Sequence, residues 1–177
     1  MELNTAIHLI EKGVDKDLPN QLWADLGAGS GLFTRALVQL LKPPCSIYAV
    51  DINPNGLKNI SSNYPAAEII PVVADFTKDD LPVSNPDGII MANSLHYVSD
   101  PLSFLQKLKS LLKPGGRIII IEYDTDKPNT WVPWPVSYKK LQEICKQVEK
   151  LPVEKIATHP SMYRGSGMYV AVMKPEV

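Results

Sequence analysis

Residues 23–37, WADLGAGSGLFTRAL, place three glycines within five positions, between an apolar lead-in and an apolar run with helical spacing. This pattern predicts a strand that passes through a sharp turn into a helix. Glycine tolerates positive φ and lets the backbone approach a neighbour closely. Gly27, Gly29 and Gly31 therefore indicate either a cradle for a ligand or a tight turn that binds nothing.

The spacing of these glycines narrows the kind of ligand. A phosphate-binding loop needs GxxxxGK[ST], and no lysine follows here. A dinucleotide fingerprint prefers GxGxxG, but position 32 is leucine. Residues 25–31 instead read DLGAGSG, an acidic residue followed by GxGxG. A nucleotide-binding dehydrogenase stays open as one alternative, and a non-catalytic module that binds a cofactor or a partner stays open as another.

Outward from this stretch, strand-like and helical segments alternate five times before a final pair of strands. The alternation predicts an α/β fold with a doubly wound, mostly parallel seven-stranded sheet, an antiparallel last strand and helices on both faces. The expected strands are 21–26, 46–50, 68–74, 87–91, 117–123, 153–158 and 168–173. The expected helices cover about 3–14, 30–40, 54–64, 101–112 and 137–151.

Length and composition predict one domain. The chain has 177 residues, which we treat as residues 1–20, an N-terminal helix and lead-in, and residues 21–177, the core. A net charge of −1 gives no reason to expect nucleic acid or an anionic membrane as a partner. No apolar run spans a bilayer, no signal-peptide pattern is present, and the two cysteines lack metal-ligand spacing. We therefore expect a cytoplasmic protein without a metal.

Several further motifs accompany DLGAGSG in a fixed order. They are AVDINP (49–54), ADFTKDDLP (74–82), LLKPGGRIIIIEY (111–123) and MYVAVMKP (168–175). Together these motifs resemble class I S-adenosylmethionine-dependent methyltransferases over roughly residues 20 to 174. The resemblance implies a Rossmann-like fold, S-adenosylmethionine as cofactor, S-adenosylhomocysteine as product, and methyl transfer to an unidentified acceptor, most simply a small molecule.

The resemblance also implies cofactor contacts at the strand ends. Asp51 would accept from both ribose hydroxyls, with Ile52 on the adenine face, or it would cap a helix instead. Asp75 would accept from the adenine amine and the Phe76 backbone would meet a ring nitrogen, or Asp75 would close a turn. Asp25 would orient the loop, reach the cofactor's amino group through water, or serve as a structural carboxylate. The implied cofactor-binding residues are Asp25, Leu26, Gly27, Ala28, Gly29, Gly31, Asp51, Ile52, Asp75, Phe76 and Asn93.

By the same resemblance, NSLHYVSD at residues 93–100 would face the transferred methyl group. The [DN]PP[YF] motif of enzymes that methylate nucleobase or glutamine nitrogens is missing, so that subclass is disfavoured. His96 is a candidate base or substrate-orienting residue, or a packed loop histidine. The proline-rich segment 125–138 either walls a substrate pocket or packs down through its tryptophans. The substrate-pocket candidates are His96, Tyr123, Trp131 and Trp134, and no catalytic residue is assigned.

Short flanking segments predict an open site. Roughly twenty residues precede the first core strand, and the connection after strand 117–123 is short. We therefore expect room for a large substrate, a homodimer or a partner protein that closes the site. In the last loop, Arg164 would hold a substrate carboxylate or be solvated.

Overall fold

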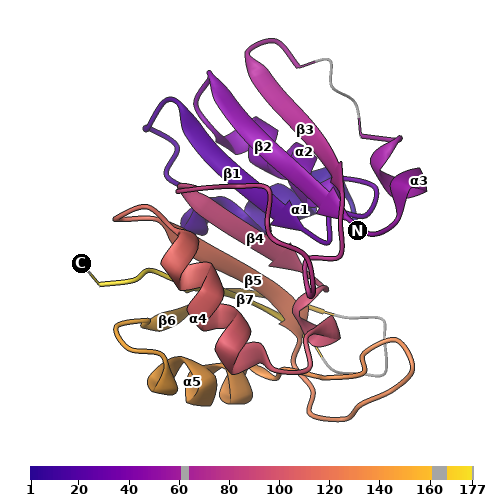
Figure 1. The fold of residues 1–177 in the computed structure, drawn as a ribbon, viewed down its shortest axis with the longest axis vertical. Helices are drawn as coiled ribbons and strands as arrows, with labels where there is room; N and C mark the ends of the chain where they lie inside the picture. Colours follow the sequence, from indigo (N-terminus) through magenta and orange to yellow (C-terminus); the bar gives the residue numbers. More distant parts are fainter. Residues whose placement is uncertain (61–63, 161–166, 177) are drawn as a thin grey trace.

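A single twisted sheet of seven strands, in the order β3-β2-β1-β4-β5-β7-β6, forms the centre of the molecule (Figure 1). The computed structural model describes residues 1–60, 64–160 and 167–176. The strands are β1 (Gln21–Leu26), β2 (Cys45–Asp51), β3 (Ala67–Val73), β4 (Gly88–Ala92), β5 (Arg117–Tyr123), β6 (Val153–His159) and β7 (Met168–Met173). The helices are α1 (Leu3–Ile10), η1 (Glu11–Gly13), α2 (Leu32–Leu40), α3 (Pro54–Leu57), η2 (Leu95–Tyr97), α4 (Pro101–Leu111) and α5 (Tyr138–Gln147).

Strands β1 to β5 are parallel, so their carboxyl ends meet at one edge of the sheet. β7 runs antiparallel to both β5 and β6. The strand order reverses where β1 lies between β2 and β4, and open α/β sheets bind ligands outside the carboxyl ends at such a point. The prediction of the fold class is confirmed, including the antiparallel last strand.

The isoleucine run of β5 shows why both faces of the sheet are covered. Ile118 and Ile120 pack into the core beneath α4 and α5, which lie in front of the sheet in Figure 1. Ile119 and Ile121 pack into the core beneath α1 and α2, on the opposite face. Side chains alternate between the faces of a strand, so a continuous apolar run suits a strand buried on both sides.

Two local features differ from the prediction. The helix expected over 54–64 forms only over Pro54–Leu57, and residues 61–63 lie outside the described residues. The last expected helix is shorter, Tyr138–Gln147. The connection 74–87, all of it described, contains no helix, and none was expected there. Pro82 and Pro86 fall in that connection, and proline cannot supply the backbone N–H that a helix interior needs.

Candidate functional site

The glycine-rich turn joins β1 to α2, and its three glycines have different neighbours. Gly27, Gly29 and Gly31 have φ values of +84°, +54° and +79°, where a side chain is strained. A Cβ on Gly27 would lie 2.5 Å from Ser94 Cβ, and one on Gly31 would lie 2.7 Å from Ile60 Cγ1. A Cβ on Gly29 would meet no described atom within 4 Å. Protein packing therefore explains two glycines, and only Gly29 faces open space.

Asp51, at the end of β2, ties the glycine turn to the neighbouring strand. Its Oδ2 accepts from the Gly29 N–H at 2.8 Å, and its Oδ1 accepts from the Asn53 N–H at 2.8 Å. The cap of α3 is Asn53, whose side chain accepts from the Asn55 N–H, so Asp51 does not take the capping role. Because backbone N–H groups hold both of its oxygens, the carboxylate has a fixed orientation at the edge of the sheet.

Asp25, the first residue of the DLGAGSG motif, is buried behind the turn. It is 1% exposed, and Thr34 Oγ1 donates to its Oδ2 at 2.6 Å. Its Oδ1 has no hydrogen-bond partner among the described residues. Burial raises the pKa of Asp25 from 3.8 to about 6. A buried oxygen without a partner carries its full desolvation cost, which a ligand that donates a hydrogen bond would relieve.

Asp75 follows β3 and closes a turn. Its Oδ1 accepts from the Thr77 N–H at 3.0 Å and from Thr77 Oγ1 at 2.6 Å. Lys78 Nζ donates to its Oδ2 at 2.7 Å, and this contact lowers the pKa of Asp75. The turn considered as the alternative role of Asp75 is therefore present. Each carboxylate oxygen has two lone pairs, so the turn does not by itself exclude a further donor.

The strand ends surround a cavity of ≈ 530 Å³, here called the first cavity. Six of the predicted cofactor-binding residues line it, and Thr77, Ser94 and Tyr97 line it without having been predicted. The lining residues are Gly27, Asp51, Ile52, Asp75, Phe76, Thr77, Asn93, Ser94 and Tyr97. Of the remaining predicted residues, Leu26 and Ala28 are buried. The sequence pattern thus located most of this cavity wall.

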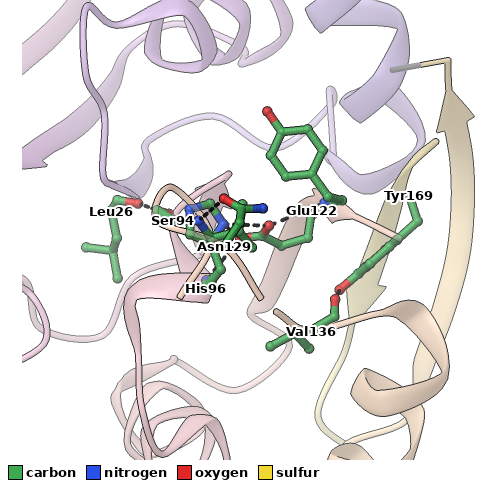
Figure 2. Close-up of polar contacts among 9 residues, drawn as sticks. Leu26, Ser94, His96, Glu122, Asn129, Val136 and Tyr169 are labelled. Atoms are coloured by element: carbon green, nitrogen blue, oxygen red, sulfur yellow. Dashed lines mark hydrogen bonds and ion pairs between the residues drawn. The ribbon is translucent and has the colours of Figure 1, made fainter. Parts of the chain in front are cut away.

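Asn93 and Ser94 form the wall that follows β4. Asn93 has a φ of +53°, and its buried Oδ1 has no partner within the described part of the chain. Ser94 Oγ donates to the Leu26 carbonyl at 2.6 Å, which links the β4 end to the β1 end (Figure 2). Asn93 therefore adds a second buried acceptor that no described residue satisfies.

A buried histidine–carboxylate pair lies under the same edge of the sheet. His96 and Glu122 are 2% and 1% exposed. Glu122 accepts from His96 Nδ1, with contacts of 2.9 and 3.0 Å to its two oxygens, and from the His96 backbone N–H at 3.2 Å (Figure 2). The packed-histidine alternative for His96 fits this burial. A role of His96 in substrate orientation stays a prediction.

The segment 125–138 is held by its valines and backbone rather than by its tryptophans. Val132 and Val136 are buried, and the Val136 carbonyl accepts from Tyr169 Oη at 2.8 Å (Figure 2). The backbone N–H of Trp134 donates to the His96 carbonyl at 3.0 Å. Trp131 and Trp134 nevertheless stay 68% and 51% exposed. The tryptophans therefore do not serve mainly to pack the segment down.

Two further candidates have simple outcomes. Tyr123, at the end of β5, is partly buried, with its ring centroid 6.4 Å from that of His96. Arg164 lies outside the described residues.

Among the residues that the structure describes, no group of three or more His, Cys, Asp or Glu side chains is placed to hold a metal ion. No helix in the described ranges is both long and apolar enough to cross a membrane.

Three pairings in this region were not predicted from the sequence: those of Thr34 with Asp25, Ser94 with Leu26, and Glu122 with His96. Thr34 and Ser94 are small polar residues inside the quoted stretches 23–37 and 93–100, but nothing in the pattern indicates their partners. Glu122 had one indication, because it follows four isoleucines in a strand that is buried on both faces. A charged residue in such a strand needs a partner.

Comparison with protein families decides the family. Residues 24–120, more than half of the chain, match the family model described as a methyltransferase domain. The chain belongs to this methyltransferase family. The resemblance to class I S-adenosylmethionine-dependent methyltransferases, predicted from the motifs, is confirmed.

Individual relatives are more distant. A demethylmenaquinone methyltransferase of Chlamydia muridarum is 32% identical over 115 residues, which cover 65% of this chain and 49% of that protein. The structure of the YcgJ protein of Bacillus subtilis has a TM-score of 0.74 at 13% identity, covering 98% of this chain and 99% of that one. The structure of 1,6-didemethyltoxoflavin-N1-methyltransferase of Burkholderia thailandensis, with bound 1,6-didemethyltoxoflavin and S-adenosylhomocysteine, has a TM-score of 0.75 at 17% identity, covering 99% and 78%. The chain spans about half the length of the curated relatives it matches.

Proposed function

We propose that this protein binds S-adenosylmethionine in the first cavity and transfers its methyl group to a small-molecule acceptor. The observation that carries the proposal is the meeting of the family motifs around one cavity. Two buried acceptor atoms that no described residue satisfies support it: Asn93 Oδ1 in the cavity wall, and Asp25 Oδ1 behind the glycine turn. When bound, the cofactor supplies a methyl group already activated on a positively charged sulfur. Its amino group is a hydrogen-bond donor of the kind that these two oxygens lack.

The chain's own residues supply binding and alignment. Gly29 and Asn53 fix the Asp51 carboxylate through one lone pair on each oxygen, which leaves acceptor capacity for the two ribose hydroxyls. Ile52, which is 67% exposed, offers an apolar surface at the rim for one face of adenine. Phe76 would contact adenine from the opposite side, and Asp75 would lie near the exocyclic amine.

Methyl transfer from such a donor depends largely on alignment and on removal of water from the nucleophile. The absence of an assigned base is compatible with this chemistry, because a base is needed only when the nucleophile arrives protonated. The relatives named for demethylmenaquinone and for 1,6-didemethyltoxoflavin support an acceptor that is a small molecule. Closure of the site by a second copy or a partner, and a cytoplasmic location, stay predictions from the sequence.

Calorimetric titration tests the proposal, with S-adenosylmethionine and S-adenosylhomocysteine beside NAD and ATP. We expect selective binding of the first two. Asp51→Ala is expected to weaken that binding about ten- to a hundredfold, because it removes a charge-assisted contact. Glu68→Gln, a change of an exposed carboxylate on β3, is the matched control and should leave the affinity unchanged.

Each contrary result points elsewhere. Unchanged affinity in the Asp51 variant would remove the ribose assignment. Selective binding of NAD would favour a dehydrogenase. Binding of none of the four compounds would favour a non-catalytic module that acts through a partner.

A further inference from the structure

A second cavity of ≈ 550 Å³ adjoins the first, and its wall combines residues of segments 74–82 and 93–100 with Ser103, Phe104, Lys107 and Trp134. The two cavities share Thr77 and Tyr97 as walls. Three aromatic rings line the second cavity: Tyr97, Phe104 and Trp134. A ligand that lies there and contacts Tyr97 is therefore next to the edge of the first cavity. We call this space the aromatic recess.

Two of these three rings are about half exposed to solvent, and the fold does not require this exposure. Tyr97 and Trp134 are each 51% exposed, whereas Phe104 is buried. Large aromatic side chains gain free energy when they leave water, and exposed ones that gather at a cavity indicate a binding surface. The exposure of Tyr97 and Trp134 is thus a cost that a bound ring would reverse.

Both exposed residues contact the same buried residue, His96. The backbone N–H of Trp134 donates to the His96 carbonyl at 3.0 Å, and the Tyr97 ring centroid lies 4.4 Å from that of His96. His96 is fixed in turn by the two contacts to Glu122. Both wall residues are therefore anchored at a buried, hydrogen-bonded residue, and an anchored wall loses less conformational entropy when a ligand binds.

The polar side chains around the recess are partly satisfied by one another. Lys78 donates to Asp75 at 2.7 Å, and Ser103 Oγ donates to Asp100 Oδ2 at 2.7 Å. The apolar part of the lining is chiefly aromatic. Flat rings suit such a surface, because offset or edge-to-face contacts add to the burial of apolar area.

We propose that the aromatic recess holds the methyl acceptor by a flat aromatic ring that packs against Tyr97 and Trp134. The link to methyl transfer rests on the proposed function, because it assumes the cofactor in the first cavity. The ring-binding property itself is a statement about the recess and can be measured without the cofactor.

The test uses the whole isotope-labelled chain and two probes, 2-naphthol and its saturated counterpart decahydro-2-naphthol. The chain has three tryptophans, so NMR gives three indole N–H signals, and the signal lost in Trp134→Phe identifies Trp134. We expect 2-naphthol to shift this signal in a saturable way. The signal of Trp23, which is fully buried and donates to Gln21 Oε1 at 3.1 Å, should not move.

Calorimetry with the same probes supplies the affinities. The saturated probe is expected to bind at least about fivefold more weakly, because it is not flat and has no π-system. Trp134→Leu and Tyr97→Leu should each weaken 2-naphthol binding about five- to tenfold. Leu18→Ala changes another exposed apolar side chain, shortly before β1 and thus near the opposite edge of the sheet, and should have no effect.

The outcomes separate this inference from the proposed function. S-adenosylhomocysteine should bind Trp134→Leu as it binds the unchanged protein, since Trp134 does not line the first cavity. The inference is overturned if the Trp134 signal does not respond, if both probes bind equally, or if Trp134→Leu leaves 2-naphthol affinity intact while S-adenosylhomocysteine still binds. If S-adenosylhomocysteine fails to bind but the 2-naphthol pattern holds, the proposed function fails and the ring site stands.

Discussion

The two sides of the carboxyl edge are built by different means. The side formed by β1 and β2 relies on the backbone: glycines with positive φ, and N–H groups that hold Asp51. The side formed by β4, β5 and segment 125–138 relies on side chains that meet across elements, above all His96 and Glu122. The difference shows that one protein can build one side of this edge from a short local motif and the other from a packed assembly of distant residues.

The largest expected effect comes from breaking the side-chain assembly. Glu122→Gln removes the carboxylate that fixes His96 in a buried setting, and we expect a loss of about 4 kcal/mol in the free energy of unfolding. Urea denaturation measures it. Glu68→Gln, at an exposed position on β3, should change the value by less than about 0.5 kcal/mol. A loss below about 1 kcal/mol for Glu122→Gln would mean that the pair is not a main support of this side.

A single added methyl group is expected to destabilise the side formed by β1 and β2. Gly27→Ala forces a side chain into positive φ and brings its Cβ to 2.5 Å from Ser94 Cβ, so we expect a loss of about 3 kcal/mol. Gly115 is the matched control, because its φ is +80° but a Cβ there would meet no described atom within 4 Å. Gly115→Ala should cost only about 1 kcal/mol. Equal losses in thermal or urea unfolding would show that crowding by Ser94 has no role.

Asp25 gives a pH-dependent test of the backbone side. The pKa of Asp25 in the folded protein, about 6, lies above the ordinary 3.8. The stabilisation that comes from binding this proton is therefore complete below pH 3.8, and it is lost as the pH rises through about 6. Asp25→Asn cannot ionise and lacks this loss. Relative to the unchanged protein, the variant should gain up to about 3 kcal/mol of unfolding free energy between pH 4 and 7. Parallel pH profiles of the two proteins would contradict the raised pKa.

The smallest expected effect concerns the helix that follows the tryptophans. Ser137 Oγ accepts from the Lys140 N–H at 3.2 Å and caps α5, whereas α2 starts at Gly31 without a side-chain cap in the described structure. Ser137→Ala should cost about 1 kcal/mol in the free energy of unfolding. Ser84→Ala, at an exposed position in the β3–β4 connection, is the control and should be neutral within about 0.5 kcal/mol.

The sequence predicts the sheet well because each strand carries its own evidence. The isoleucines of β5 and the aspartates at or next to the ends of β1 and β2 are recognised from neighbouring positions alone. Contacts between distant residues do not: Asp25 and Thr34 are 9 residues apart, His96 and Glu122 are 26 apart, and Leu26 and Ser94 are 68 apart. Such partners follow from packing. The first cavity was therefore largely predictable, whereas for the aromatic recess the sequence indicated Trp134 and segment 93–100 but not that they meet Phe104.

The place of β7 has a consequence for how the chain is made. Met168–Met173 is the last strand in the sequence, yet it inserts between β5 and β6 and bonds to both. On a ribosome, β5 and β6 emerge before the strand that joins them, so one edge of β5 stays open during synthesis. An open, apolar edge pairs readily with other chains. Fragments that stop before Met168 are therefore expected to aggregate, and the final residues of the sheet decide whether newly made chains stay apart.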